Sequence, residues 1–81
     1  MSSEHTQFRE RQLRQFERQL VEHGRGSVEK SRATLARRLA DHLYKLAEIR
    51  QVGGHTSSVE REIRNFQQQI AAIDNILRGE P

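Results

Sequence analysis

The chain contains no cysteine and no tryptophan, and its 81 residues include one proline and one tyrosine. Without cysteine there are no disulfide bonds, thiol nucleophiles or cysteine-ligated zinc sites. No apolar run approaches the roughly 18 residues that a transmembrane helix needs, so we expect no membrane span. The first five residues lack the basic and apolar regions of a secretory signal, and we therefore expect a cytoplasmic protein.

Residue patterns typical of enzymes are also missing. The four histidines, His5, His23, His42 and His55, do not share a helix face with the spacing of metal ligands. The Gly24-Arg25-Gly26 stretch is too short for a phosphate-binding loop. A helical bundle of this size has little room for an enclosed pocket of about 300 Å³. We therefore expect no catalysis, no metal site and no cofactor.

Glycines divide the chain into three segments without helix breakers: residues 6–23, 27–52 and 57–78. All three have apolar residues at helical spacing and none alternates with a period of two, which predicts an all-α fold. Ser27 is a candidate N-cap for the second helix, and Ser57 with Glu60 forms a candidate capping box for the third. We expect one helical domain over residues 1–81, with frayed ends at 1–5 and 80–81.

The third segment has an uninterrupted heptad seam, in which apolar residues step by 4, 3, 4, 3 and 4. The seam consists of Val59, Ile63, Phe66, Ile70, Ile73 and Leu77. Because these six residues share a narrow arc of about 80°, we expect the helix to bury them against a single partner groove. The short Gly53–Thr56 connection predicts that this partner is the second segment, in an antiparallel, coiled-coil-like hairpin.

The second segment is apolar on a wider arc, about half of its circumference. Its first line, the leucine line, consists of Leu35, Leu39, His42, Leu46 and Ile49, and its second, the alanine line, consists of Ala36, Ala40, Leu43 and Ala47. We expect the leucine line to pack on the third helix. Since one hairpin partner cannot cover both lines, the small residues of the alanine line should admit a further helix.

The first segment carries a short apolar stripe among arginines: Phe8, Leu13, Phe16, Leu20 and Val21. This stripe can complete a three-helix bundle within the chain, or it can reach a second chain in a dimeric helical bundle. Both arrangements use the same contacts, so the sequence leaves them open; we favour a symmetric dimer. The predicted protein interface is Phe8, Leu13, Phe16, Leu20, Ala36, Ala40, Leu43 and Ala47.

His42 interrupts the leucine line and has two interpretations. It could act as a pH switch or register marker, because a charged imidazole is costly in an apolar seam. It could also be a partly solvated or hydrogen-bonded core histidine. We expect the substitution His42→Leu to raise thermal stability without changing the helical content, and a large loss of stability would show that the imidazole makes a specific buried bond.

The charge is unevenly distributed along the chain. The net charge is +3, and residues 24–53 hold seven basic and three acidic side chains. The candidate phosphate contacts are Arg25, Lys30, Arg37, Arg38 and Lys45. Asp41 dilutes this charge and is placed to pair with Arg37 and Lys45 at a spacing of four residues. No aromatic platform accompanies the basic residues, and no known DNA-binding spacing is present.

The outline of residues 35–78, two amphipathic segments joined by Gly53-Gly54, is similar to the small helical-hairpin co-chaperones of type III secretion needles. It also resembles the coiled-coil hairpin of transcript-cleavage factors, in which acidic residues at the tip act. Here no acidic residue precedes Glu60 at the tip, so that activity is not implied. Any capped heptad hairpin has this outline, and it assigns no family.

These features together predict a non-enzymatic helical interaction module: an assembly adaptor, small chaperone or regulator. The expected partner is a second copy of the chain or another helical protein. The alternative is a small basic accessory protein that binds DNA phosphates through the middle helix. Membrane binding is not expected, because acidic residues balance the arginines of the first segment.

Overall fold

The computed structural model describes residues 3–79, apart from the side chains of residues 3–6, 8 and 9. It contains three helices: α1 (Ser3–His23), α2 (Arg25–Gln51) and α3 (Ser57–Arg78). No strand occurs within residues 3–79. The all-α prediction is therefore confirmed. Phe8, one member of the predicted apolar stripe of the first segment, lies outside the described side chains.

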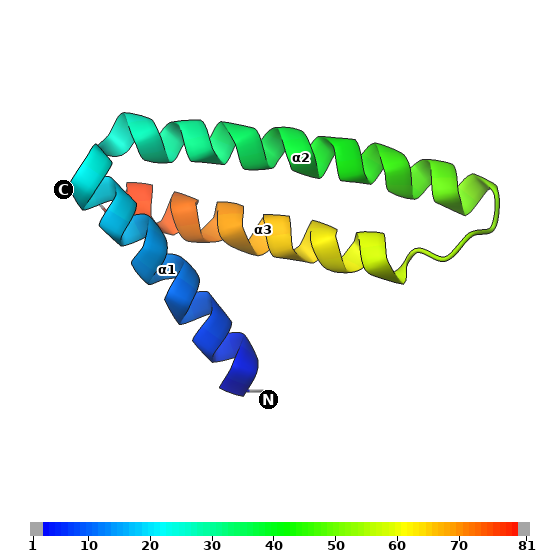
Figure 1. Ribbon diagram of the computed structural model, residues 1–81, viewed down its shortest axis with the longest axis horizontal. Helices are drawn as coiled ribbons and strands as arrows, with labels where there is room; N and C mark the ends of the chain where they lie inside the picture. The colour runs from blue at the N-terminus through cyan, green and yellow to red at the C-terminus, as the bar shows by residue number, and fades with distance from the viewer. Residues whose placement is uncertain (1–2, 80–81) are drawn as a thin grey trace.

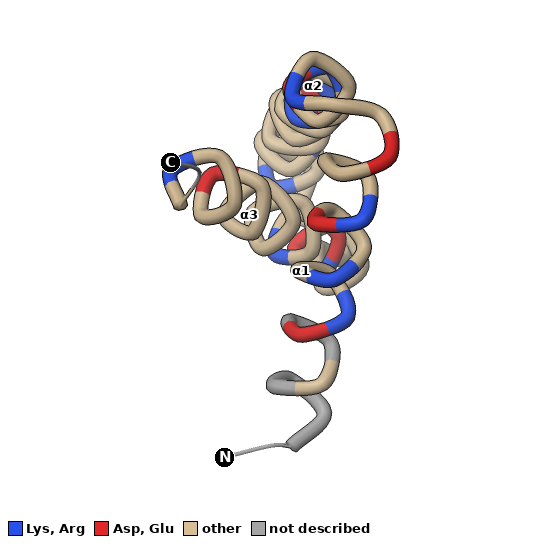
Figure 2. The backbone as a smooth tube through the Cα atoms, turned by 90° about the vertical axis from the view of Figure 1, so that its left-hand side faces the viewer, with Lys and Arg blue, Asp and Glu red and all other residues tan. Residues whose placement is uncertain are grey.

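The helices α2 and α3 lie side by side and run in opposite directions, whereas α1 leaves their shared end at an angle (Figure 1). Viewed from that end, the three helices occupy the corners of a triangle (Figure 2). Away from it, α1 diverges and α2 and α3 continue as a pair (Figure 1). The molecule measures 47 × 31 × 17 Å, so it is long and thin.

A single residue, Gly24, separates α1 from α2. Its φ of 87° lies in the region that favours glycine, and it turns the chain so sharply that α2 resumes at Arg25. The predicted N-cap at Ser27 is therefore wrong, since Ser27 lies inside the helix. Its hydroxyl oxygen instead accepts a hydrogen bond from Gln19 Nε2 of α1 at 2.9 Å.

The capping prediction for α3 is also wrong by one residue. Thr56 holds the N-cap position in place of Ser57, because its carbonyl oxygen accepts the first helical hydrogen bond from the Glu60 N–H at 2.8 Å. The Glu60 carboxylate does reach back, but to the hydroxyl of Thr56, which donates to Oε2 at 3.0 Å. The backbone N–H of Ser57 is not its target.

The apolar core consists of two clusters. The base cluster, near the α1–α2 junction, contains Phe16, Val28, Leu35, Ala72, Ile73 and Ile76. The tip cluster, toward the α2–α3 connection, contains Leu46, Val59 and Ile63, with Leu39 and Ile49 packed against it. All three helices contribute to the base cluster, but only α2 and α3 contribute to the tip cluster.

The environment of α3 corrects the prediction that one groove would cover its seam. Ala72 and Ile76 lie outside the seam and are nevertheless buried. They are buried because α1 packs on this side of α3, in addition to α2 on the seam side. The heptad seam of α3 indicates its contact with α2. The contact with α1 uses Ala72 and Ile76, which lie beside the seam.

Phe16 is the one side chain of α1 that is buried among those described, at 5% exposure. We expect Phe16→Ala to lower the free energy of unfolding by about 3–5 kcal/mol, because it removes a ring from the base cluster and leaves a cavity. Val21 on the same helix is 85% exposed, so Val21→Ala should stay within about 0.5 kcal/mol of wild type. Urea unfolding followed by circular dichroism measures both, and equal effects would contradict the packing of α1 on α2 and α3.

Candidate functional site

The α1 part of the predicted interface lies within the chain's own core. Phe16 is buried in the base cluster, and Leu13 and Leu20 pack against it half-buried. In this structure the apolar stripe of α1 therefore completes a three-helix arrangement within one chain. The side chain of Phe8, the fourth predicted contact on α1, lies outside the described residues.

The α2 part of the predicted interface is open to solvent. Ala40 and Ala47 are exposed, Leu43 is 47% exposed and Ala36 is half-buried. The neighbouring Tyr44 is 70% exposed. The small residues of the alanine line would allow a further helix to pack closely. Within this chain, however, α1 does not pack on them.

A polar contact explains why α1 lies elsewhere. Gln19 Nε2 donates to the hydroxyl oxygens of Ser27 and Ser31, each at 2.9 Å, and so ties α1 to α2. At about 100° per residue, these two serines lie on the side of α2 roughly opposite the alanine line. The single-residue turn at Gly24 and this contact together hold α1 away from the alanine line.

The candidate DNA contacts do not form one continuous row. Lys30, Arg37, Arg38 and Lys45 are all exposed. At about 100° per residue, Lys30 and Arg37 fall on one side of α2 and Arg38 and Lys45 about 80° further round. Acidic and basic positions are interspersed along the visible turns of α1 (Figure 2).

Acidic side chains lie beside the candidate DNA contacts and reduce their positive charge. Arg25 Nε donates to Glu29 Oε1 at 2.9 Å, and its Nη1 donates to the carbonyl oxygen of Leu77 at 3.3 Å. Asp41 and Glu48 lie on the same side of α2 as Lys30 and Arg37. The expected pairing of Asp41 with Arg37 and Lys45 is not formed among the described residues.

A bidentate ion pair joins α2 to α3 beside the base cluster. Arg32 Nε and Nη2 donate to the two carboxylate oxygens of Asp74 at 2.5 and 3.1 Å. The hydrogen bonds from Arg32 lower the pKa of Asp74 below its ordinary value of 3.8; partial burial opposes this, and the charges of Arg32 and Arg78 add to it. No sequence pattern indicates this pair, because its members are 42 residues apart and belong to no repeat.

His42 is a hydrogen-bonded residue of the α2–α3 interface. Its Nδ1 donates to the carbonyl oxygen of Arg38 at 2.8 Å, and its Nε2 contacts the Glu62 carboxylate of α3. The ring also meets Phe66 edge-on, with 4.9 Å between centroids. The imidazole thus holds a polar partner while remaining on the leucine line, which agrees with the second interpretation above.

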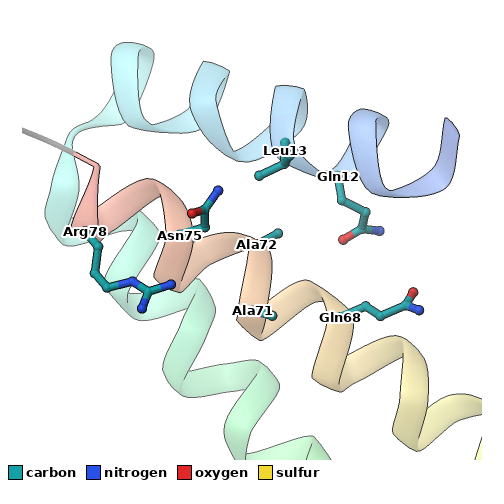
Figure 3. Close-up of a pocket in the computed structure, with 7 residues that line it drawn as sticks. All are labelled: Gln12, Leu13, Gln68, Ala71, Ala72, Asn75 and Arg78. Carbon is teal, nitrogen blue, oxygen red and sulfur yellow. The ribbon is translucent and has the colours of Figure 1, made fainter. Parts of the chain in front are cut away.

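A groove of ≈ 310 Å³ opens where α1 diverges from α3 (Figure 3). The sequence predicted too little room for an enclosed pocket of this size, but an angled helix leaves a groove at the surface. Gln12 Oε1 is buried there without a hydrogen-bond partner. The lining consists of Gln12, Leu13, Gln68, Ala71, Ala72, Asn75 and Arg78, so amides and small apolar groups predominate.

A second opening, of ≈ 560 Å³, lies between α2 and α3 near Arg25, Arg32 and Arg78. Two of these arginines already hold carboxylate partners, Glu29 and Asp74. Among the residues that the structure describes, no group of three or more acidic or histidine side chains could hold a metal ion. Within the same part of the chain, no helix combines the length and apolarity needed to cross a bilayer.

Comparisons of the chain with protein-family models, with curated proteins and with solved structures find no match. The functional inference therefore rests on the surfaces of the molecule itself. One candidate among them is the exposed side of α2, which combines the apolar side chains of Leu43 and Tyr44 with the charges of Lys30 and Arg37, unpaired within the described residues.

The Arg32–Asp74 pair predicts an acid-sensitive part of the stability. Since Asp74 titrates lower in the folded than in the unfolded state, its contribution is present above about pH 3.8 and is lost as the pH falls through the folded-state pKa. Asp74→Asn should lower the urea midpoint at pH 7, and the difference from wild type should vanish in acid. The pair is partly exposed, so 1 M salt should reduce the difference.

Glu17→Gln removes an exposed carboxylate of α1 and is the matched control for that experiment. It should leave the midpoint unchanged across the same pH series. If Asp74→Asn retained a constant destabilisation down to acid pH, the loss would arise from packing and not from the ion pair.

His42→Leu remains a test of the leucine line. The Glu62 side chain is 51% exposed and can return to water, while leucine fills the space between Leu39 and Leu46. We expect a gain of roughly 1 kcal/mol in the free energy of unfolding, the balance between added apolar burial and the lost polar contacts of the imidazole. Thermal unfolding followed at 222 nm measures it; a marked loss would show that the imidazole contacts stabilise the fold more than apolar packing does.

Proposed function

We propose that the chain is a non-enzymatic helical interaction module that works as a homodimer or with a helical protein partner. In this proposal α2 and α3 form a coiled-coil-like hairpin whose alanine line contributes to a larger helical bundle. An assembly adaptor, a small chaperone and a regulator are the classes of role that such a surface suits.

The observation that carries the proposal is the large surface of the single chain. It exposes 6231 Å², whereas a compact monomer of 9.5 kDa is expected to expose roughly 5,000 Å². Its radius of gyration is 14.7 Å, compared with about 12 Å for a compact domain of this length. The excess, on the order of 1,000 Å², matches the area that one partner buries in a stable protein–protein complex.

The location of the exposed apolar groups supports the same conclusion. Leu43 and Tyr44 lie on α2, toward the half of the molecule that α1 does not cover. The tip cluster contains only three buried residues, so this half has little core of its own. A further helix against the alanine line would bury both the alanines and Leu43.

The alternative is a DNA-binding accessory protein. It is supported by the four exposed basic side chains Lys30, Arg37, Arg38 and Lys45, which have no acidic partner within the described chain. Asp41 and Glu48 on the same surface weaken it, because they would face the phosphates.

Sizing with light scattering, with and without random-sequence duplex DNA at low salt, separates the two functions. The interaction module predicts a dimer, or a larger assembly, whose mass does not change when DNA is added. A monomer that binds DNA with a steep salt dependence would contradict it and favour the alternative. A monomer that ignores DNA would leave a different protein as the partner.

A further inference from the structure

The alanine line of α2 is longer than its four predicted members. Ala33 precedes them and is exposed, so that Ala33, Ala36, Ala40, Leu43 and Ala47 step by 3, 4, 3 and 4. At about 100° per residue these five lie within an arc of about 80°. Tyr44 adjoins this arc, and no charged residue falls within it between positions 30 and 50. The result is an uncharged heptad seam on the open side of α2.

The side chains of this extended alanine line change in size along the helix. Before Ala40 the line holds only Ala33 and Ala36, whereas after Ala40 it holds Leu43, with Tyr44 beside it, and then Ala47. A surface whose large side chain lies to one side of its midpoint fits itself when the two copies run in opposite directions, because Leu43 then faces Ala36 of the second copy. Two parallel copies would place Leu43 against Leu43 and leave a gap between the alanines.

The charges along the neighbouring edge show the same pattern. Lys30, Arg37, Asp41 and Glu48 fall in the next arc of about 40°, in the order basic, basic, acidic, acidic. None of these four forms an ion pair among the described residues. In an antiparallel pair centred near Ala40, Arg37 faces Asp41 of the second copy and Lys30 faces Glu48. A parallel twofold pair brings opposite edges of the two helices together, so these four residues would not face one another.

We propose that the partner of the extended alanine line is a second copy of this chain, paired antiparallel through α2 about a twofold axis near Ala40. The inference rests on the interaction function proposed above and names its partner and its geometry. The excess surface of the single chain supplies the area that such a dimer needs. In this antiparallel dimer, Lys30 and Arg37 form ion pairs with the second copy and do not bind DNA phosphates.

Crosslinking through introduced cysteines tests the orientation, and the absence of native cysteine makes it specific. In the antiparallel pair, Ala33 lies opposite Ala47 of the second copy, while the two copies of Ala33 are about 21 Å apart along the helix. With a short bismaleimide, Ala40→Cys should crosslink to itself. Ala33→Cys alone should not crosslink, but Ala33→Cys mixed with Ala47→Cys should.

Charge reversal provides a second measurement. Arg37→Glu places two like-charged contacts in the dimer and should weaken self-association about tenfold at low salt. The double variant Arg37→Glu/Asp41→Arg restores opposite charges across the twofold axis and should return the dissociation constant to near the wild-type value. Gln15→Glu, an exposed position on α1, is the control and should have no effect.

The outcomes separate this inference from the proposed function. Antiparallel crosslinks together with rescue by the double variant support it. A dimer in which Ala33→Cys crosslinks to itself, or in which the double variant dimerises no better than Arg37→Glu, overturns the antiparallel pairing and leaves the interaction function in place. A folded wild-type chain that stays monomeric at high concentration overturns the second copy as partner.

Discussion

Phe16 and Leu20 bring α1 onto only one end of the α2–α3 pair, and the properties of the rest of the molecule depend on this limited coverage. Where three helices meet, Ile73 and Val28 are fully buried. Beyond that point α2 and α3 pack only against each other, and the core consists of Leu46, Val59 and Ile63 with their neighbours. Two helices in contact bury one stripe each, so the remaining apolar surface of α2 stays open. The thin shape, the large surface and the exposed alanine line all have this one cause.

The polar contacts between helices set their alignment more than they add to buried area. Arg32 with Asp74, and His42 with Glu62, lie along the α2–α3 boundary and match positions on the two antiparallel helices. Gln19 with Ser27 and Ser31 does the same for α1 on α2. Because the contacts are directional, they specify which face of α2 is used within the chain. The opposite face of α2 is thereby left exposed.

Helix periodicity predicted the three helices and the leucine line well, since apolar spacing directly reflects which face of a helix is buried. The helix starts were less predictable. The turn at Gly24 lets α2 begin at Arg25, before the predicted cap Ser27, whose hydroxyl accepts a hydrogen bond from Gln19 instead. The placement of α1 and the burial of Ala72 and Ile76 depend on tertiary contacts that no single segment encodes. In the candidate site the width of the apolar arc predicted that α3 alone would not cover the alanine line, but it did not predict that α1 would pack elsewhere and leave the line exposed. Its extension to Ala33 and the self-complementary order of Lys30, Arg37, Asp41 and Glu48 could be interpreted only once their side was known to be open.

The central claim is that the open face of α2 is covered in the working form of the protein. Tyr44 borders this face, and in a chain without tryptophan it is the dominant fluorophore. Acrylamide quenching of its fluorescence over a dilution series measures the accessibility of that face directly. If the open face is covered, quenching is weak at high protein concentration and strong on dilution, with helical content unchanged. Strong quenching at every concentration, in a chain that stays folded, would contradict it.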